Sequence, residues 1–135
     1  MIKDVQLGKE IVITVANKIG ILADLSKILA DHGINLEAVA GYTKENEARI
    51  MLVTEDNLRA KDALTKAGYK AAKENPVLML TLENKTGALK LLAAKLASEQ
   101  IDINYVYGTT CMSACPARLI LSTNNNEKAL LAFKK

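Results

Sequence analysis

Two short loops hold the residues of this sequence that are best suited to binding a small charged molecule. The first is Asn17-Lys18-Ile19-Gly20, and the second is Asn84-Lys85-Thr86-Gly87, which follows at a shift of 67 positions. Each loop is expected to join a strand to a helix, where unpaired N–H groups and the positive end of the helix dipole attract a carboxylate. Glycine lets the backbone approach a ligand closely. A turn in which the asparagine caps the helix is the plainer interpretation.

A second pair of polar residues could take the opposite charge. Asn35 and Asp102 each stand between two aliphatic residues at the start of a predicted strand, and the same shift relates them. Because neighbours on a strand point to opposite faces, both side chains should lie away from the core, near the strand-to-helix loop of a neighbouring domain. They could receive an ammonium group there. An ordinary exposed strand residue is the alternative.

A free amino acid fits this distribution of charge. Its carboxylate would lie on the N–H groups near Gly20 or Gly87, and its ammonium group near Asn35 or Asp102. Small and aliphatic neighbours of the glycines would contact the ligand's side chain, so a small or aliphatic amino acid is expected. Because Asp102 changes the charge of the second site, the two sites need not be equivalent. The predicted ligand-binding residues are Asn17, Ile19, Gly20, Ile21, Leu22, Asn35, Asn84, Thr86, Gly87, Ala88, Leu89 and Asp102.

Cys111 and Cys115 stand close together in the turn of a predicted hairpin. Two thiols at this spacing could bind a metal or form a reversible disulfide, but a structural zinc site needs about four ligands. The only histidine, His32, belongs to the other half of the chain. It is expected to stabilise the C-terminal end of its helix rather than to bind a ligand. Two cysteines without a secretion signal imply a reducing cytoplasm, so we expect ordinary reduced thiols, with redox and metal roles as alternatives. No metal site or cofactor is predicted.

The sequence lacks the residues that several other classes of function would require. The sequence shows no pair of nucleophile and base, no glycine-rich phosphate loop and no carboxylate dyad, so it is not predicted to be an enzyme. The net charge is +3 with scattered Lys and Glu, and residues 48–54 and 117–123 carry no aromatic side chains for stacking RNA bases. No apolar run approaches the roughly 18 residues of a membrane span. We therefore expect a cytoplasmic protein that binds neither nucleic acid nor membranes.

The elements that would position these residues occur twice. β-branched and alternating runs predict strands, and leucines at helical spacing predict helices. Matches such as Leu52 with Leu119 and Leu64 with Leu131 extend the repeat, which divides the chain into residues 1–67 and 68–135. In the first copy the expected elements are strand 11–15, a helix from 22 to Gly33, strands 34–42 and 48–54, and a helix from 56 to Gly68; in the second they are strand 77–83, helix 87–99, strands 101–110 and 117–123, and helix 125–134.

The order of elements predicts an α+β fold of two ferredoxin-like β-α-β-β-α-β domains in tandem, each an antiparallel sheet with helices on one face. The first copy ends with a predicted short strand, Tyr69 to Lys73, whereas the second copy stops before one. The N-terminal strand, residues 2–7, is therefore expected to complete the other copy's sheet. Units of roughly 60 residues bury a small fraction of their surface and are only marginally stable alone. The two units should therefore stabilise each other or pair with another chain.

The sequence resembles the ACT domain family over nearly its whole length, twice. The pattern of strand, Asn-x-Pro-Gly-x-Leu turn, helix and Gly-Ile-Asn-Ile-like entry to the next strand is matched in copy one by Asn17, Gly20, Leu22, Gly33, Ile34, Asn35 and Leu36, and in copy two by Asn84, Gly87, Leu89, Ile101 and Ile103. The departures are Ile19 or Thr86 for proline, Asp102 for asparagine and Gln100 for glycine.

The resemblance implies a function. ACT domains are small regulatory domains that bind amino acids in metabolic enzymes and sensors, with the ligand at interfaces between paired domains. The chain looks most like the double ACT proteins that carry no catalytic domain. It is therefore expected to be an allosteric amino-acid sensor and a homodimer. A ligand-free interaction module, or a regulatory subunit of a separate metabolic enzyme, is the alternative.

Overall fold

The computed structural model describes residues 1–112 and 114–134, and the chain folds into two compact units. The first unit is Lys9–Asn75, and the second combines Met1–Gly8 with Pro76–Lys135. These bounds differ from the sequence repeats 1–67 and 68–135, whose last residue, Lys135, lies outside the described residues. The reason is that two long strands, β1 (Ile2–Ala16) and β4 (Lys73–Leu82), contribute residues to both units. The two strands expected at residues 2–7 and 11–15 are one continuous strand.

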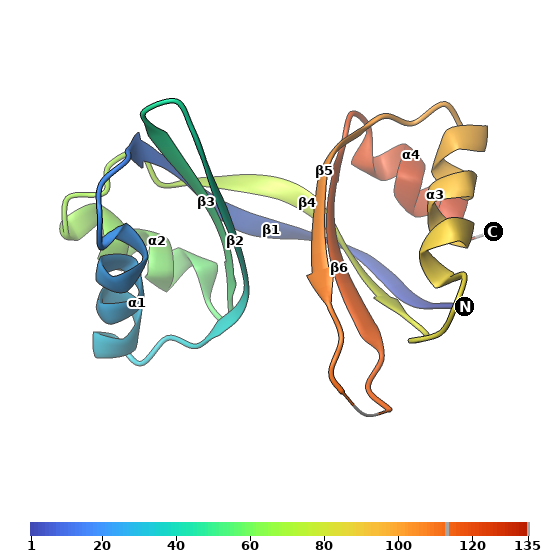
Figure 1. Cartoon of the computed structure of the whole chain (residues 1–135), viewed down its shortest axis with the longest axis horizontal. Coiled ribbons are helices and arrows are strands. Elements are labelled where there is room, and N and C mark those ends of the chain that lie inside the picture. Colours follow the sequence, from blue (N-terminus) through green and yellow to red (C-terminus); the bar gives the residue numbers. More distant parts are fainter. Residues whose placement is uncertain (113, 135) are drawn as a thin grey trace. The chain divides into compact units, whose positions relative to one another are not determined.

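The first unit has the predicted β-α-β-β-α-β order. Its strand order is β2-β3-β1-β4, with β3 antiparallel to both β1 and β2, and both helices lie on one face of the sheet (Figure 1). Its elements are residues 9–16 of β1, α1 (Ile21–Asp31), β2 (Leu36–Lys44), β3 (Glu47–Thr54), α2 (Asn57–Lys66) and residues 73–75 of β4.

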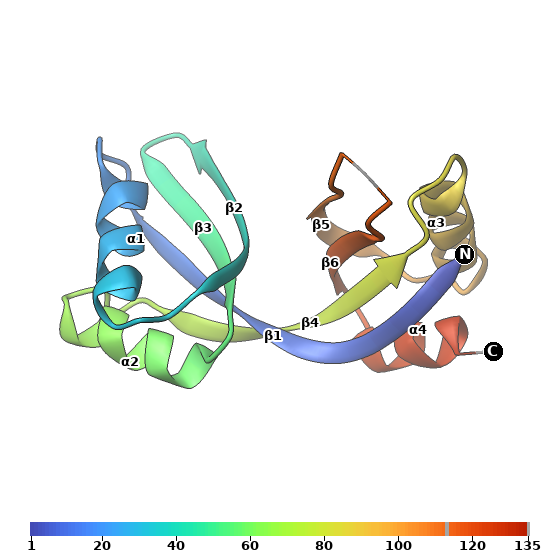
Figure 2. The same cartoon turned by 90° about the horizontal axis from the view of Figure 1, so that it is seen from below.

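The second unit has the same arrangement, but its last strand comes from the N-terminal end of the chain. Residues 2–8 of β1 run beside β4, and the strand order is β1-β4-β6-β5 (Figure 2). Val5 from this segment is buried in the core of the unit, which agrees with the expectation that the N-terminal strand completes the second sheet. The other elements are residues 76–82 of β4, α3 (Ala88–Ser98), β5 (Ile103–Thr109), β6 (Ala117–Thr123) and α4 (Asn126–Phe133).

Each unit has an apolar core between its sheet and its helices. In the first unit Ile11, Leu25 and Leu52 are almost completely buried, and in the second Leu78 and Leu92 are. These side chains lie at the alternating and helical positions that the sequence predicts to be internal. Along residues 1–112 and 114–134, the structure contains no helix with the length and apolar character of a membrane span.

The strand expected at Tyr69 to Lys73 is not formed. Residues 69–72 belong to no strand and include a turn at residues 70–71, and β4 begins at Lys73. Tyr69 packs against the core of the first unit, and its hydroxyl donates a hydrogen bond of 2.5 Å to Asp24 Oδ2 on α1. This side-chain anchor holds the segment to the helix layer before the chain enters the sheet.

The second hairpin carries two extra residues at its tip. In the first hairpin Tyr42 pairs with Arg49, and in the second Thr109 pairs with Arg118. Six residues therefore separate the paired positions in the first hairpin and eight in the second. The first tip is a tight turn at Glu45, which has φ 57°, and Asn46.

The insertion shifts every later equivalence from 67 to 69 positions. Leu52 pairs with Ile11, and its counterpart in the second sheet is Leu121, which pairs with Leu78. The predicted matches of Leu52 with Leu119 and of Leu64 with Leu131 are therefore wrong. Burial agrees, because Leu64 is fully buried whereas Leu131 is 63% exposed. Leucines two positions apart on one strand conceal such a shift in the sequence.

One asparagine in each unit ties three elements together. The Oδ1 atom of Asn57 accepts hydrogen bonds from Thr54 N (3.0 Å) and Thr54 Oγ1 (2.8 Å), and its Nδ2 donates to Lys9 O (2.8 Å). Asn126, 69 positions later, makes the same contacts with Thr123 and with Pro76 O. Each asparagine thus joins the third strand of its unit, the following helix and the central strand.

We expect Asn57→Ala to lower the free energy of unfolding of the full chain by about 2–3 kcal/mol. The substitution removes three hydrogen bonds and leaves partly buried groups without partners, at about 1 kcal/mol each. Chemical denaturation measures the change. Thr65→Ala, at an exposed position on the same helix, is the control and should have almost no effect. A loss below about 0.5 kcal/mol for Asn57→Ala would contradict the assigned role.

Deleting Met1–Leu7 should destabilise the second unit and cause aggregation. The deletion removes Val5 from the core, together with the Met1 carbonyl that accepts a hydrogen bond from Glu83 N (2.8 Å). It also exposes the edge of β4, and an open strand edge recruits other chains. The expected loss exceeds about 3 kcal/mol, since one or two aliphatic side chains lose their burial. Light scattering and denaturation measure both effects, with Gln6→Ala as the exposed control; unchanged solubility and stability would refute the assigned strand.

Candidate functional site

The two helices that follow the Asn-Lys-x-Gly loops begin differently from the other two helices. Gly20 before α1 and Gly87 before α3 have φ 92° and 91°, and neither helix has a side-chain cap. By contrast, the side chains of Asp56 and Asn125 cap α2 and α4 by accepting a backbone N–H. Left-handed φ angles are natural for glycine and strained for other residues. The first N–H groups of α1 are therefore not bonded by a side chain at the cap and can face an anion, whereas at the start of α3 the Ala88 N–H donates to Lys85 O (3.2 Å).

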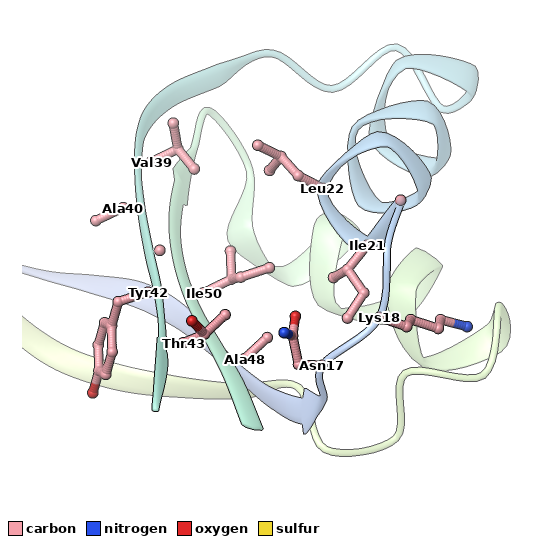
Figure 3. A pocket seen from close by; sticks show the side chains of 12 residues that line it. Asn17, Lys18, Ile21, Leu22, Val39, Ala40, Tyr42, Thr43, Ala48 and Ile50 are labelled. Atoms are coloured by element: carbon pink, nitrogen blue, oxygen red, sulfur yellow. The ribbon is translucent and has the colours of Figure 1, made fainter. Parts of the chain in front are cut away.

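Asn17 does not cap α1, so the interpretation of the first loop as a turn with a capping asparagine is wrong. Its backbone N–H donates to Asn46 O (2.7 Å), which ties the loop to the tip of the first hairpin. Its side chain points into the space between α1 and β2 (Figure 3). The amide of Asn17 is therefore placed to contact a molecule bound in that space.

A surface hollow of about 540 Å³ lies between the first loop and the first hairpin. Its floor is formed by the buried side chains of Ile21, Ala48 and Ile50, whereas Leu22 and Val39 at its rim are about half exposed. Figure 3 shows Leu22 and Ile50 directed into this space. The complete lining is Asn17, Lys18, Gly20, Ile21, Leu22, Val39, Ala40, Gly41, Tyr42, Thr43, Ala48 and Ile50.

The wall of the hollow on β2 comes from alternate residues. Val39, Gly41 and Thr43 share the face toward α1, while Tyr42 points to the opposite face (Figure 3). A Cβ atom at Gly41 would meet the Ile50 side chain at 3.6 Å, an ordinary contact. The lack of a side chain at Gly41 thus leaves room in the hollow. The backbone at this position would accept an alanine without strain.

The charged groups around this hollow lie outside its interior. The Lys18 side chain points away from it (Figure 3). Asp24, in the first turn of α1, would repel an anion at the helix N-terminus, but its carboxylate accepts the hydrogen bond from Tyr69. That hydrogen bond, together with burial and the negative charge of Asp24, raises the pKa of Tyr69 to about 12. Tyr69 therefore keeps its proton at neutral pH and continues to engage Asp24.

Two residues of the first predicted site do not line this hollow. Ile19 is fully exposed, and Asn35 follows the C-terminal end of α1. Gly20 precedes the other end of this 11-residue helix, which is about 16 Å long. Asn35 exchanges backbone contacts with Glu55, whose Oε1 accepts from Asn35 N (3.2 Å) and whose N donates to Asn35 O (3.2 Å). The first unit therefore does not bring Asn35 to its own loop.

The second loop borders a smaller hollow of about 320 Å³ with a different character. Of the residues predicted for the second site, Asn84 lines it. Asp102 lies elsewhere, where its N–H donates to Asn124 Oδ1 (3.1 Å), as Asn35 does to Glu55. Thr86, Gly87, Ala88 and Leu89 are not among the lining residues, which are Lys3, Glu83, Asn84, Lys85, Ala114, Cys115 and Pro116.

Charge and sulfur distinguish this second hollow. Lys85 contacts Glu83 at 3.1 Å, and its side chain, with the ammonium of Met1, lowers the pKa of the Glu83 carboxyl. Cys115 forms a disulfide with Cys111, so the expectation of two reduced thiols is wrong. The Cα atoms of the pair are 5.6 Å apart, within the usual range for a disulfide. Across the described residues, no group of three or more His, Cys, Asp or Glu side chains could hold a metal ion.

Sequence reasoning located the loop of the first hollow but missed its opposite wall. The residues missed are Lys18 in the loop itself and, on the hairpin, Val39, Ala40, Gly41, Tyr42, Thr43, Ala48 and Ile50. A signal was present, because Val39, Gly41 and Thr43 recur at the repeat shift as Val106, Gly108 and Thr110. Their alternate spacing puts them on one face of a strand. Only the fold shows that this face meets the loop.

Comparison with known proteins identifies the fold. The sequence model of the ACT domain family matches residues 9–67. The protein BT0572 from Bacteroides thetaiotaomicron is 24% identical, with 96% of this chain and 88% of that chain covered and a TM-score of 0.88. The ligand-free regulatory subunit of aspartate kinase from Thermus thermophilus is 15% identical, with 98% and 96% covered and a TM-score of 0.66.

A larger protein contains the same arrangement. Aspartokinase III from E. coli, solved in complex with aspartate and ADP, is 17% identical, with 97% of this chain and 32% of that chain covered and a TM-score of 0.57. No curated protein sequence matches this chain. At these identities the structural likeness shows a shared fold.

Glycine-to-alanine substitutions should distinguish the two hairpins. A Cβ at Gly108 would lie 2.3 Å from Arg118 O and 2.3 Å from Leu119 Cδ2, whereas the same atom at Gly41 makes ordinary contacts. Gly108→Ala should therefore lower the free energy of unfolding by about 1–3 kcal/mol, as overpacking does. Gly41→Ala is the matched control and should leave stability unchanged or slightly higher. Equal effects in denaturation experiments would show that the two hairpins are packed alike.

Proposed function

We propose that this chain is a regulatory protein that binds a free amino acid, a proposal supported by the match of residues 9–67 to the ACT domain family model. The observation that carries the proposal is the start of α1, which has no side-chain cap and opens onto a hollow with an apolar floor. In this proposal the chain catalyses no reaction, and it acts in the cytoplasm. The hollow of the first unit is the proposed site.

The ligand's carboxylate is proposed to lie at the N-terminus of α1. The N–H groups of Ile21 and Leu22 follow Gly20 there, and the helix dipole favours a negative charge. The amide of Asn17 points into the same space and can donate to the carboxylate (Figure 3). The two N–H donors are fixed by the backbone, so only the Asn17 side chain needs to be ordered on binding.

The ligand's side chain would contact the floor of the hollow. Ile21, Ala48 and Ile50 offer aliphatic surface, and Leu22 and Val39 extend it at the rim. With the Lys18 side chain directed away, the interior contains no charged group to pair with a charged ligand side chain. A small or aliphatic amino acid is therefore the expected ligand.

The ammonium group is proposed to be received by a neighbouring domain in a homodimer. Asn35 and Asp102 are exposed and lie away from the hollows of their own units, so they can serve only the loop of another domain. The two sites would then differ, since the second loop borders a hollow with Lys3, Glu83 and Lys85. The remaining loop residues of the second predicted site, Thr86 to Leu89, would contact a ligand only when two chains pair in the homodimer.

A ligand-free interaction module, or a regulatory subunit of a separate metabolic enzyme, is the second candidate. One observation favours it: Leu22 and Val39 at the rim of the first hollow are each about half exposed, which would suit a protein partner. The regulatory subunit of aspartate kinase from Thermus thermophilus has the same fold. The two candidates differ in whether a free amino acid binds.

Binding of an amino acid should raise the melting temperature of the chain. A thermal-shift screen of the twenty amino acids identifies the ligand, and calorimetry then measures its affinity. Asn17→Ala should weaken binding roughly ten- to hundredfold, because a charge-assisted hydrogen bond contributes about 1.5–3 kcal/mol. Lys18→Ala is the neighbouring control and should bind as the natural chain does. If no amino acid binds, the interaction-module candidate replaces this one; if Asn17→Ala binds normally, the proposed site is wrong.

A steric substitution tests the hollow itself. Gly41→Ala puts a methyl group on its wall without straining the strand. We expect the melting temperature without ligand to stay unchanged and the affinity for the amino acid to fall. Undiminished affinity would show that the ligand does not use this wall.

A further inference from the structure

We propose that Cys111 and Cys115 form a reversible thiol–disulfide site whose redox state controls the hollow beside the second loop. The inference goes beyond the proposed amino-acid binding and does not depend on it. It rests on the paired sulfurs, on the place of the pair in the hairpin, and on the lining of the second hollow.

The disulfide lies in the tip of the second hairpin, which is two residues longer than the tip of the first hairpin. Both hairpins pair equivalent residues up to Tyr42 with Arg49 and Thr109 with Arg118, and only beyond them does the second tip lengthen by two residues. The tight turn of the first hairpin closes without a cross-link. The longer tip is instead closed by a covalent bond that spans four positions.

Opening this bond leaves the core of the unit in place. Of the described residues between 110 and 116, none belongs to the core cluster of the second unit, whereas Ala117 and Leu119 on β6 pack against it. Only a short loop is closed, so the disulfide constrains few residues of the unfolded chain. The pair can therefore change state while the sheet and helices remain folded.

The redox state of the pair is coupled to the second loop by contact. Cys115, with its neighbours Ala114 and Pro116, forms one side of the second hollow, and Asn84 and Lys85 form another. A closed disulfide fixes the wall that contains Cys115. A reduced pair releases that wall and changes the surroundings of Asn84 and Lys85.

The setting favours exchange with an external dithiol. Cys115 is exposed and Cys111 is half-buried, so Cys115 is the sulfur that a reductant reaches. Lys3 and Lys85 line the same hollow as Cys115, and positive charge near a sulfur favours its thiolate, with Glu83 offsetting part of that charge.

The chemistry is a two-electron exchange. A thiolate of the dithiol attacks Cys115 Sγ, and Cys111 leaves as a thiolate that takes up a proton. The second thiol of the reductant then attacks its own sulfur in the mixed disulfide and releases Cys115, which is protonated in turn. The protein gains two electrons and two protons, and the dithiol becomes a disulfide. Oxidation by a disulfide is the reverse reaction.

The test equilibrates the full chain with mixtures of reduced and oxidised dithiothreitol, without any amino acid. Free thiols are trapped with a maleimide that adds mass, and the species are counted by mass spectrometry. We expect both cysteines to become protected together in a single transition. Protection should rise from about one tenth to about nine tenths of the molecules over a roughly eighty-fold change in the ratio of reduced to oxidised reagent.

Amide NMR spectra of the two end states test the coupling. The N–H signals of Asn84 and Lys85 should shift on reduction, whereas those of Asn17 and Lys18 at the equivalent first loop should not. A Cys111→Ser and Cys115→Ser double variant is the control, and its spectrum should not respond to the redox mixture. Two free thiols in the most oxidising mixture, cross-linked chains in place of the internal bond, or unshifted Asn84 and Lys85 signals would each overturn the proposal.

Discussion

The backbone hydrogen bonds of β4 are the interaction on which the rest of the second unit depends. Counted along the chain from Pro76, that unit has two helices but only three of its four strands, and the open side of β4 would lack partners. Residues 2–8 of β1 supply them and bring Val5 into the core. The helices α3 and α4 can then cover a complete four-stranded sheet. This constraint explains why the compact units do not coincide with the sequence repeats.

Sequence periodicity was sufficient for the order of elements and insufficient for their alignment. Alternating apolar residues predicted the strands of both hairpins, and apolar residues at helical spacing predicted the four helices. Burial of one face produces each of these patterns. The two-residue insertion at the second tip escaped detection, since Leu119 and Leu121 are equally good matches for Leu52 in sequence. Only the pairing of strands decides between them. The junctions at Asn57 and Asn126 show the true shift, because each recruits a threonine three positions earlier.

The candidate site shows the same division. The loop at Gly20 was predictable, because glycine before a helix marks a backbone that needs a left-handed φ and leaves N–H groups open. The opposite wall depends on which face of β2 turns toward α1, and this follows from the fold. Asn35 was assigned by its place in the strand, yet a helix of 11 residues separates it from Gly20. Local patterns therefore located the loop of the hollow but did not show that Asn35 lies at the other end of the helix.

The two loops preserve one backbone geometry and have acquired different surroundings. Gly20 and Gly87 have nearly identical φ angles, so both helices follow a glycine in the left-handed region. The first loop faces aliphatic side chains over a roomy strand wall, whereas the second borders lysines, a glutamate and a disulfide. At Gly108 the hairpin backbone lies too close to Leu119 to admit even a methyl group, unlike at Gly41. Because the helix terminus alone sets no preference among anions, these walls determine what each loop contacts, and the duplicated loops are suited to different roles.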